Sequence, residues 1–341
     1  MLTNVSMDML SAKYNSSVLA AVAEFLCSHN SNRSRPTVDL YCLEFPINYP
    51  VVVQIFVGVA FMALIVFALI GNGLVMWIIA RHKIMHQSFY YFLFNLALAD
   101  FLIALLNVGT SWTYNFYYDW WFGDFCPFNH YFGVVPTCVC VFTMMVVSWD
   151  RCAAVSNPLG KRHMSKTATI LVLFGVWLLA AVIGLPSFLY SRVEKRYFYS
   201  AQEQRLFTQN LCVNLFPLEK EYNVLLLIIN YVIPLFVLLA TFLKIVLSLR
   251  QDSKDRLLNS NSNGHLTKRR RAVKMLALVM AIFIICWLPY QLYHTVLERY
   301  ISNMSTAAYT YMAVYWLAMS TAMYNPVIYF FMNKRYGSEV S

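Results

Sequence analysis

Charged side chains are scarce in this sequence. Only 12% of its 341 residues are Asp, Glu, Lys or Arg, whereas 60% are hydrophobic. Soluble chains carry about 25% charged and about 45–50% apolar residues, and one soluble core could not bury this much apolar surface. A large soluble helical domain would also shorten its apolar runs to about 10–14 residues. The runs here are longer, which excludes a soluble protein and indicates a membrane protein.

Further absences narrow the functional class. No spacing of Cys and His is typical of a metal site, and no nucleophile lies beside a base at one membrane depth, so we expect no enzyme, no cofactor and no bound metal. No internal repeat is present, which disfavours transporters built from duplicated halves. Polar groups at membrane depth are few, so a transporter or channel is a weaker hypothesis than a receptor.

Long apolar runs are what the sequence has instead, and each covers about 20 residues or more. The runs are Val51–Ala80, Phe89–Ser111, Cys126–Trp149, Ala168–Tyr190, Tyr222–Leu249, Ala272–Leu297 and Ala307–Met332. Lipid offers no partner to free backbone N–H and C=O groups, so each run is predicted to be a helix. The predicted fold is an all-α membrane protein, a seven-helix bundle over 51–332. An extracellular glycosylated tail (1–50) precedes it and a short cytoplasmic tail (333–341) follows.

Lys and Arg residues predict the orientation. Fifteen of them follow the first, third, fifth and seventh runs and nine lie in the segments on the other side, with the densest cluster at 268–271. The side richer in Lys and Arg is cytoplasmic, which places the N-terminus outside. The net charge of +10 then lies mainly at the cytoplasmic face, beside membrane lipid, and does not indicate nucleic-acid binding. Four Asn-x-Ser glycosylation sequons fall on the predicted outer side, at Asn4, Asn15, Asn32 and Asn303.

Two polar segments flank the spans. The N-terminal 50 residues lack a basic stretch followed by a long apolar one, so we expect no signal peptide and expect the first span to direct insertion. Val18–Leu26 is only a short apolar stretch, broken by Glu24. The inner loop Arg250–Thr267 contains an Asn- and Ser-rich run and is predicted to be disordered.

The eight cysteines divide by compartment. Cys126, at the outer end of the third run, and Cys212, in the loop before the fifth, both face the oxidising side, so we expect a disulfide between them. For Cys27 and Cys42 in the N-terminal tail, a second bridge and two free thiols are both open. The other four lie in the membrane or at its inner edge and are expected to be small buried hydrophobes.

Asp100 lies in the middle of the second run. A carboxylate at this depth costs several kcal/mol unless it faces the interior of the bundle. Asn72 in the first run and Asn325 in the seventh lie at comparable depth and are its predicted partners. The site is either a static polar contact between helices or a hub that binds a proton or sodium ion and exchanges partners between two states. For so deep an ionisable residue we favour the hub.

Prolines and a charge pair suggest moving parts. Pro289 and Pro326 each remove a helix hydrogen bond and permit a kink, as do prolines in two other spans. Trp287, two residues before Pro289, is either a lever for the inner half of the sixth span or ordinary packing. Asp150 and Arg151 end the third run, either as an interfacial anchor or as a pair from which Arg151 swings to a partner.

Taken in order along the chain, these motifs resemble those of rhodopsin-like (class A) G-protein-coupled receptors. They are Gly71-Asn72, Leu96-Ala97-Leu98-Ala99-Asp100, Cys126, Asp150-Arg151-Cys152, Trp177, Pro234, Cys286-Trp287-Leu288-Pro289 and Asn325-Pro326-x-x-Tyr329. Within that family the chain is most similar to tachykinin (neurokinin-type) neuropeptide receptors. That similarity lies in Trp121-Phe122-Gly123, in Tyr290 after Pro289, and in Tyr315-Trp316-Leu317-Ala318-Met319-Ser320.

The resemblance implies a mechanism in the plasma membrane. A ligand enters from outside, the region of Trp287 and Phe283 rearranges, and the inner end of the sixth span swings outward. A cleft then opens for a heterotrimeric G protein, with Arg151 at its floor, and Asn325, Pro326 and Tyr329 take part in the switch. The tachykinin subfamily further implies coupling through Gq and phospholipase C to calcium.

Departures from the family pattern qualify this picture. Cys152 replaces the usual Tyr after Asp-Arg. Arg269 stands where many relatives carry an acid that pairs with Arg151, so that pair cannot form and we expect raised basal activity. Cys140 and Ala322 replace hydroxyl residues of the family's sodium site, which disfavours sodium at Asp100. The short tail beyond the seventh run leaves arrestin binding open.

The outer half of the bundle suggests the ligand. Gly133 occupies the position of the Asp that amine receptors use, so an amine is disfavoured. Amide, phenol and imidazole side chains that suit a peptide backbone and a C-terminal carboxamide map to the pocket region instead. They are Asn107, Asn129, Tyr290, Gln291, His294, Tyr311 and Tyr315. Each aromatic residue could equally serve helix packing.

Outer acids such as Asp119 and Glu194 are expected to steer a basic peptide. A tachykinin-like peptide is favoured, and another amidated neuropeptide (neuropeptide F/Y-, FF- or kinin-like) is the alternative.

Overall fold

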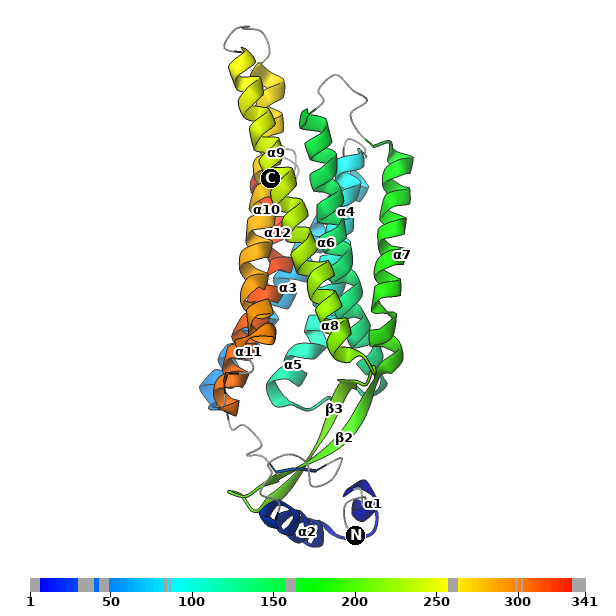
Figure 1. Ribbon diagram of the computed structural model, residues 1–341, viewed down its shortest axis with the longest axis vertical. Coiled ribbons are helices and arrows are strands. Elements are labelled where there is room, and N and C mark those ends of the chain that lie inside the picture. The colour runs from blue at the N-terminus through cyan, green and yellow to red at the C-terminus, as the bar shows by residue number, and fades with distance from the viewer. Residues whose placement is uncertain are drawn as a thin grey trace.

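The computed structural model describes residues 7–29, 40–42, 49–82, 85, 87–156, 164–256, 263–297, 300–301 and 303–332. Figure 1 shows long helices running side by side along the long axis, with a β-hairpin and two short helices gathered at one end. At the opposite end, α9 and α10 extend beyond the other helices. The predicted helical membrane bundle is therefore confirmed for this part of the chain.

The membrane spans follow the predicted runs, and several are continued by a second helix. They are α3 (Val51–Arg81), α4 (Ser88–Leu102) with η2 (Ile103–Val108) and α5 (Gly109–Tyr117), α6 (Cys126–Ser156), α7 (Lys166–Tyr190), α8 (Glu219–Leu227) with η4 (Ile228–Val232) and α9 (Ile233–Arg256), α10 (Asn263–Thr295), and α11 (Met304–Met319) with α12 (Thr321–Met332). Six spans are unbroken, apolar and long enough to cross a bilayer. The seventh is divided at Ser320 into two shorter helices.

The interruptions have local causes. The π-turn η4 ends just before Pro234, whose missing N–H leaves the preceding turn free to widen. At Ser320 the hydroxyl donates to the Leu317 carbonyl at 2.7 Å, and Thr321 Oγ1 donates to Ala318 at 2.8 Å. Such bonds compete with the helix ladder and favour a break at this point. The apolar pattern alone does not predict either feature.

Asn72 supplies the hydrogen bond that Pro326 cannot make within its own helix. Pro326 has no N–H to donate to the Ala322 carbonyl four residues earlier, and Asn72 Nδ2 donates to that oxygen instead at 2.8 Å. In lipid such a freed carbonyl requires an internal partner. Gly71 allows the approach, because a Cβ at this residue would lie 3.0 Å from Pro326. The Gly71-Asn72 motif therefore seats the kinked α12 against α3.

The outer end of the molecule has a small core of its own. It consists of α1 (Met7–Ser11), α2 (Ser16–His29), β1 (Leu40–Tyr41) and the hairpin of β2 (Ser191–Ser200) and β3 (Arg205–Asn214). The strand order is β1-β2-β3, with β1 parallel to β2 and β2 antiparallel to β3. We call residues 7–29 with 40–42 the cap. Figure 1 shows the cap packed on the hairpin beyond the helix ends.

Apolar packing and polar bonds both hold the cap. Its buried residues Met7, Leu19, Ala23 and Leu40 form one cluster with Tyr197 and Tyr199 of the hairpin. The Tyr197 hydroxyl donates to Asp8 Oδ1 at 2.8 Å. A disulfide joins Cys27 to Cys42 and so ties α2 to β1. The N-terminal segment is thus folded where the sequence suggested only a tail, because the partner of Val18–Leu26 is a hairpin far along the chain.

Three other expectations need correction or fall outside the described residues. Disorder over Arg250–Thr267 is wrong where α9 continues to Arg256 and where α10 begins at Asn263. Good helix formers such as Lys, Arg and Leu extend both apolar helices beyond the membrane. Residues 257–262, the tail 333–341 and the sequons Asn4 and Asn32 lie outside the described residues.

Candidate functional site

Asp100 faces the interior of the bundle and is only 4% exposed. Asn325 Nδ2 of α12 donates to its Oδ2 at 2.7 Å, and the Cys140 thiol of α6 donates to its Oδ1 at 3.4 Å. Asn72 is not a partner of Asp100, which corrects the sequence-based expectation: its Nδ2 donates to the carbonyls of Ala68 and Ala322. Asp100 therefore joins three helices through Asn325 and Cys140.

A cavity connects this carboxylate to the sixth span. Its lining includes Asp100, Cys140 and Asn325 together with Phe283 and Trp287 of α10. The rings of Phe283 and Trp287 lie 5.6 Å apart. Trp287 Nε1 is buried and has no hydrogen-bond partner among the described residues, and such a group costs about 1–3 kcal/mol. Four of the predicted switch residues thus surround one space with Cys140.

The donor atoms around Asp100 make a poorer sodium site than a set of oxygens alone would. A hard cation selects oxygen ligands, whereas here a sulfur contacts one carboxylate oxygen. The hydroxyls of Thr137 and Thr321, which also line the cavity, already donate to the carbonyls of Gly133 and Ala318. Their lone pairs remain, but Cys140 and Ala322 supply no oxygen from their side chains.

The inner end of α6 carries the predicted charge pair. Arg151 Nε donates to Asp150 Oδ2 at 3.0 Å, and its Nη2 bonds the same oxygen. The side chains of Arg151 and Asp150 are 16% and 8% exposed. The Arg151 guanidinium also lies 4.9 Å from the ring centre of Phe89 on α4. Sequence reasoning missed Phe89, because this contact joins two separate helices.

The aromatic residues predicted at the outer end form one cluster. Ring centres lie 4.6 Å apart for Tyr290 and His294, 5.7 Å for His294 and Tyr311, and 5.8 Å for Tyr311 and Tyr315. Tyr293 belongs to the same cluster, 5.6 Å from Tyr311, and was not predicted. Trp287 lies 5.8 Å from Tyr290 and so connects the cluster to the cavity below.

The remaining predicted residues of α10 and α12 include Gln291, Pro289 and Tyr329. Among the described residues, the Gln291 side chain has no hydrogen bond to the aromatic cluster, although its carbonyl accepts from Thr295 Oγ1 at 2.7 Å. Pro289 lies inside α10 and Pro326 inside α12. Tyr329 is almost fully buried, at 1% exposure.

Asn107 and Asn129 form an interhelical network. Asn107 Nδ2 donates to the Asn129 carbonyl at 3.1 Å and to the Ser111 hydroxyl at 3.2 Å, while Asn129 Oδ1 accepts from Thr110 Oγ1 at 2.8 Å. Both asparagines are buried. A Cβ at Gly133 would lie 2.9 Å from Asn107 Nδ2, so this network occupies the space that a longer side chain there would need.

Phe61 links the amide network to the aromatic cluster. Its ring lies 5.8 Å from Trp112, the neighbour of Ser111, and 5.9 Å from Tyr315. The structure therefore brings all seven predicted ligand residues to one end of the bundle, and six of them form two groups that share Phe61 as a bridge.

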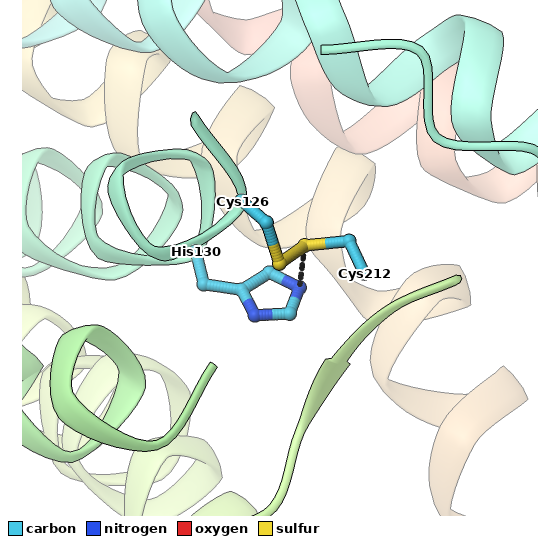
Figure 2. Close-up of side chains that lie close together, drawn as sticks. All are labelled: Cys126, His130 and Cys212. Carbon is cyan, nitrogen blue, oxygen red and sulfur yellow. Dashed lines mark hydrogen bonds between the residues drawn. A yellow bond between two sulfur atoms is a disulfide. The ribbon is translucent and has the colours of Figure 1, made fainter. Parts of the chain in front are cut away.

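The hairpin is attached to the bundle directly beside this region. A disulfide joins Cys126 of α6 to Cys212 of β3. Figure 2 shows the His130 ring against the same sulfur pair, with its Nε2 3.7 Å from Cys212 Sγ. Its Nδ1 lies 2.5 Å from the hydroxyl of Ser191, the first residue of β2. His130 thus contacts both strands, and its spacing of four residues from Cys126 on a helix is the signal that could have predicted it.

This cluster of sulfur and nitrogen atoms does not make a metal site. Cys126, His130 and Cys212 each offer an atom within 4.8 Å of the others. The thiolate is the metal-binding form of cysteine, and the disulfide removes it from both residues. The three side chains form a packed bridge between hairpin and bundle.

Two of the outer acids are engaged in the structure. Asp119 Oδ1 accepts from the Asn210 N–H of β3 at 2.9 Å, and the Trp120 N–H donates to the Asn210 carbonyl at 2.8 Å. Glu194 pairs with Arg192 at 3.0 Å and also with Arg196. Asp119 therefore holds the hairpin, and the charge of Glu194 is offset by neighbouring arginines, so neither is an open site for a basic ligand.

The described sequons cap helices. Asn15 Oδ1 accepts from the Val18 N–H at 3.2 Å at the start of α2, and Asn303 Oδ1 accepts from Thr306 at 3.1 Å at the start of α11. Both side chains are exposed. A glycan attaches through Nδ2, so a modified asparagine could still accept through Oδ1.

Comparison with known proteins gives one consistent picture. Residues 71–329 match the 7 transmembrane receptor (rhodopsin family) domain. The chain is 42% identical to the "Probable G-protein coupled receptor tkr-1" of Caenorhabditis elegans over 83% of its own length and 69% of that protein. It is 32% identical to the tachykinin-like peptides receptor 86C of Drosophila melanogaster, of which it spans 54%. It is 30% identical to the rat neuromedin-K receptor, of which it spans 61%.

Proposed function

The chain belongs to the rhodopsin family of seven-transmembrane receptors, and from this membership we propose that it detects an extracellular tachykinin-like neuropeptide and activates a heterotrimeric G protein. It is a multi-pass protein of the plasma membrane and a receptor rather than an enzyme. The proposed division is an extracellular N-terminal segment over 1–50, a receptor domain over 51–332 and a cytoplasmic tail over 333–341. The similarity to tachykinin-like receptors supports a peptide as the ligand.

The observation that carries the ligand class is the outer aromatic cluster above Trp287. Tyr290, His294 and Tyr311 present hydroxyl and imidazole groups in an apolar setting, with the buried ring of Tyr315 packed against Tyr311, and none of these tyrosines carries a negative charge at neutral pH. A peptide with aromatic side chains and an amidated end suits such a surface. An amine would need an acid, and Gly133 stands at the position expected for one.

The same residues suggest how ligand binding at the outer end changes the cytoplasmic side of the bundle. A peptide that contacts Tyr290 also biases Trp287, whose ring lies 5.8 Å away. Trp287 and Phe283 line the cavity of Asp100, so a shift of these rings changes the space around the Asp100–Asn325 bond. The agonist need only bind one arrangement of α10 better than the other to move the population. Arg151 is then exposed to the G protein, with Gq and phospholipase C as the proposed route to calcium.

A calcium screen in transfected cells tests the proposal. Cells that express the chain are exposed to amidated tachykinin-like peptides and to the same peptides as free acids. The amidated forms are expected to act at about tenfold lower concentration, because a charged carboxylate is costly to desolvate against tyrosine rings. Tyr311→Ala, at a partly exposed residue of the cluster, is expected to weaken the response, whereas Tyr300→Ala, the same substitution at an 80% exposed tyrosine outside the cluster, leaves it intact. A response to a different ligand class alone would refute the proposal.

A further inference from the structure

The guanidinium of Arg151 lies between a carboxylate and an aromatic face. Asp150, the preceding residue, accepts from Nε and Nη2 on one side. The ring of Phe89, the second residue of α4, lies 4.9 Å away from the guanidinium carbon. A cation at this distance from a ring is attracted by the negative face of its quadrupole, and arginine is the cation that most often makes such contacts.

The sixth span cannot supply a carboxylate to Arg151. The sequence of α10, from Asn263 to Thr295, contains no Asp and no Glu, and neither does α12. The inner end of α10 is instead basic, with the run from Lys268 to Arg271. Like charges repel, so α10 cannot restrain Arg151 through an ion pair.

We propose that Phe89 is the positioning residue that holds Arg151 in the resting receptor. The ring takes the role that a carboxylate on α10 would otherwise have, and it acts through Arg151 alone. This inference rests on the proposed G-protein coupling, since Arg151 must leave the ring to meet its partner. Release then requires rotation of the Arg151 side chain away from α4, not the separation of two charges by movement of α10.

Hydrogen bonds fix α4, the helix that carries Phe89, against its neighbours. The hydroxyl of Ser88 donates to the Met164 carbonyl at 2.6 Å, which fixes the start of α4. Further along, Asn95 Nδ2 donates to Thr143 Oγ1 of α6 at 2.9 Å, and Trp177 Nε1 of α7 donates to Asn95 Oδ1 at 2.7 Å. These bonds join α4, α6 and α7, so the ring is presented from a part of the bundle that does not depend on α10.

The test measures guanine-nucleotide exchange by a purified G protein with the full-length receptor in lipid nanodiscs, at equal receptor amounts and without ligand. Phe89→Leu is expected to raise basal exchange about two- to fivefold, the range that a cation–π contact at a partly exposed site supports. Phe89→Trp keeps an aromatic face and is expected to stay at the wild-type level or below it. Phe94→Leu is the matched control, the same change on the same helix at a partly buried phenylalanine.

A graded version separates ring electrostatics from packing. Phe89 is replaced by phenylalanine with one, two and three ring fluorines, which weakens the negative face with little change of volume. Basal exchange is expected to rise step by step with the number of fluorines. This series remains informative even if Phe89→Leu does not fold.

The outcomes distinguish the two proposals. If the amidated peptide that is active in the calcium screen stimulates the wild-type receptor, yet Phe89→Leu and the fluorinated series keep wild-type basal exchange, the role of Phe89 is overturned. An equal rise in Phe94→Leu overturns it as well. If no ligand of any kind gives exchange with the wild-type receptor, the proposed function fails first.

Discussion

The cap and the membrane bundle are held together in different ways. The cap rests on a cluster of six buried residues, a two-residue strand and the Cys27–Cys42 disulfide. The bundle has one extended apolar core that spans its helices and, within it, a polar hub at Asp100. A small core cannot stabilise a fold alone and needs a covalent tie, whereas lipid already enforces the helices of the bundle.

The difference suggests a division of labour. The cap offers little internal freedom, since a disulfide and a sheet fix its parts. The bundle contains broken helices, an unpartnered Trp287 Nε1 among the described residues and a cavity beside Asp100, features that permit a second arrangement. We therefore expect changes in the cap to alter stability and ligand access, and changes in the bundle to alter signalling.

The largest effect is expected at the junction of the two regions. Cys126→Ser with Cys212→Ser removes a bridge between residues 86 apart in sequence, which is worth about 4–5 kcal/mol. The hairpin loses its covalent attachment to α6, so peptide binding and surface expression should both fall steeply. Radioligand binding and cell-surface labelling measure this. Normal binding in the double variant would mean that Asp119 and His130 suffice to hold the hairpin.

The second disulfide isolates the cap. Cys27→Ser with Cys42→Ser opens a 15-residue separation and should cost the cap about 3 kcal/mol. Hydrogen exchange is expected to accelerate in α2 and β1 and to stay unchanged in α6, because α6 lies in the bundle core. Loss of protection throughout α6 would show that the two regions unfold as one unit, which would contradict their separate stabilisation.

Part of this contrast was predictable from sequence. The spans, the inward orientation of Asp100 and its bond to Asn325 follow from apolar length and the cost of a buried carboxylate. The bond from Asn72 to Ala322 did not follow, because it depends on which carbonyl Pro326 leaves free. The cap escaped prediction because the partner of Val18–Leu26 is the hairpin that carries Tyr197 and Tyr199, far along the chain.

The candidate site likewise contains some contacts that the sequence predicts and others that it does not. The aromatic residues of α10 and α11 recur at helical spacing, so their clustering could be expected. Asn107 and Asn129 were predicted as ligand contacts, yet the structure engages both in a bond between helices, a pairing that requires knowledge of helix rotation. Phe89 and Tyr293 were missed because nothing in a single run marks which ring faces a neighbouring helix.

Substitution of Asp100 tests whether the polar hub of the bundle is needed for signalling. Asp100→Ala leaves Asn325 Nδ2 without its acceptor, at a cost of about 1–3 kcal/mol, and removes the group that links three helices. Agonist-stimulated nucleotide exchange is expected to fall about tenfold, while protection of the cap in hydrogen exchange stays the same. Asp100→Asn keeps an acceptor and should retain more activity. Unaltered exchange in Asp100→Ala would make the site a static contact.

The smallest effect compares two glycines within the bundle. Gly71→Ala places a Cβ 3.0 Å from Pro326 and should cost about 1 kcal/mol through overpacking. Gly175→Ala meets nothing within 4 Å and should stabilise α7 by about 0.5–1 kcal/mol. Thermal unfolding of the purified receptor measures both. Opposite signs support close seating of α12 on α3, and two equal shifts would contradict it.

Movement of the inner end of α10 is the most direct test of the whole account. Spin labels at Lys166→Cys on α7 and Lys268→Cys on α10 allow their separation to be measured by pulsed electron resonance in nanodiscs, with and without the active peptide. We expect a longer label separation with peptide and no such change in Asp100→Ala. An unchanged separation while the peptide drives nucleotide exchange would contradict it.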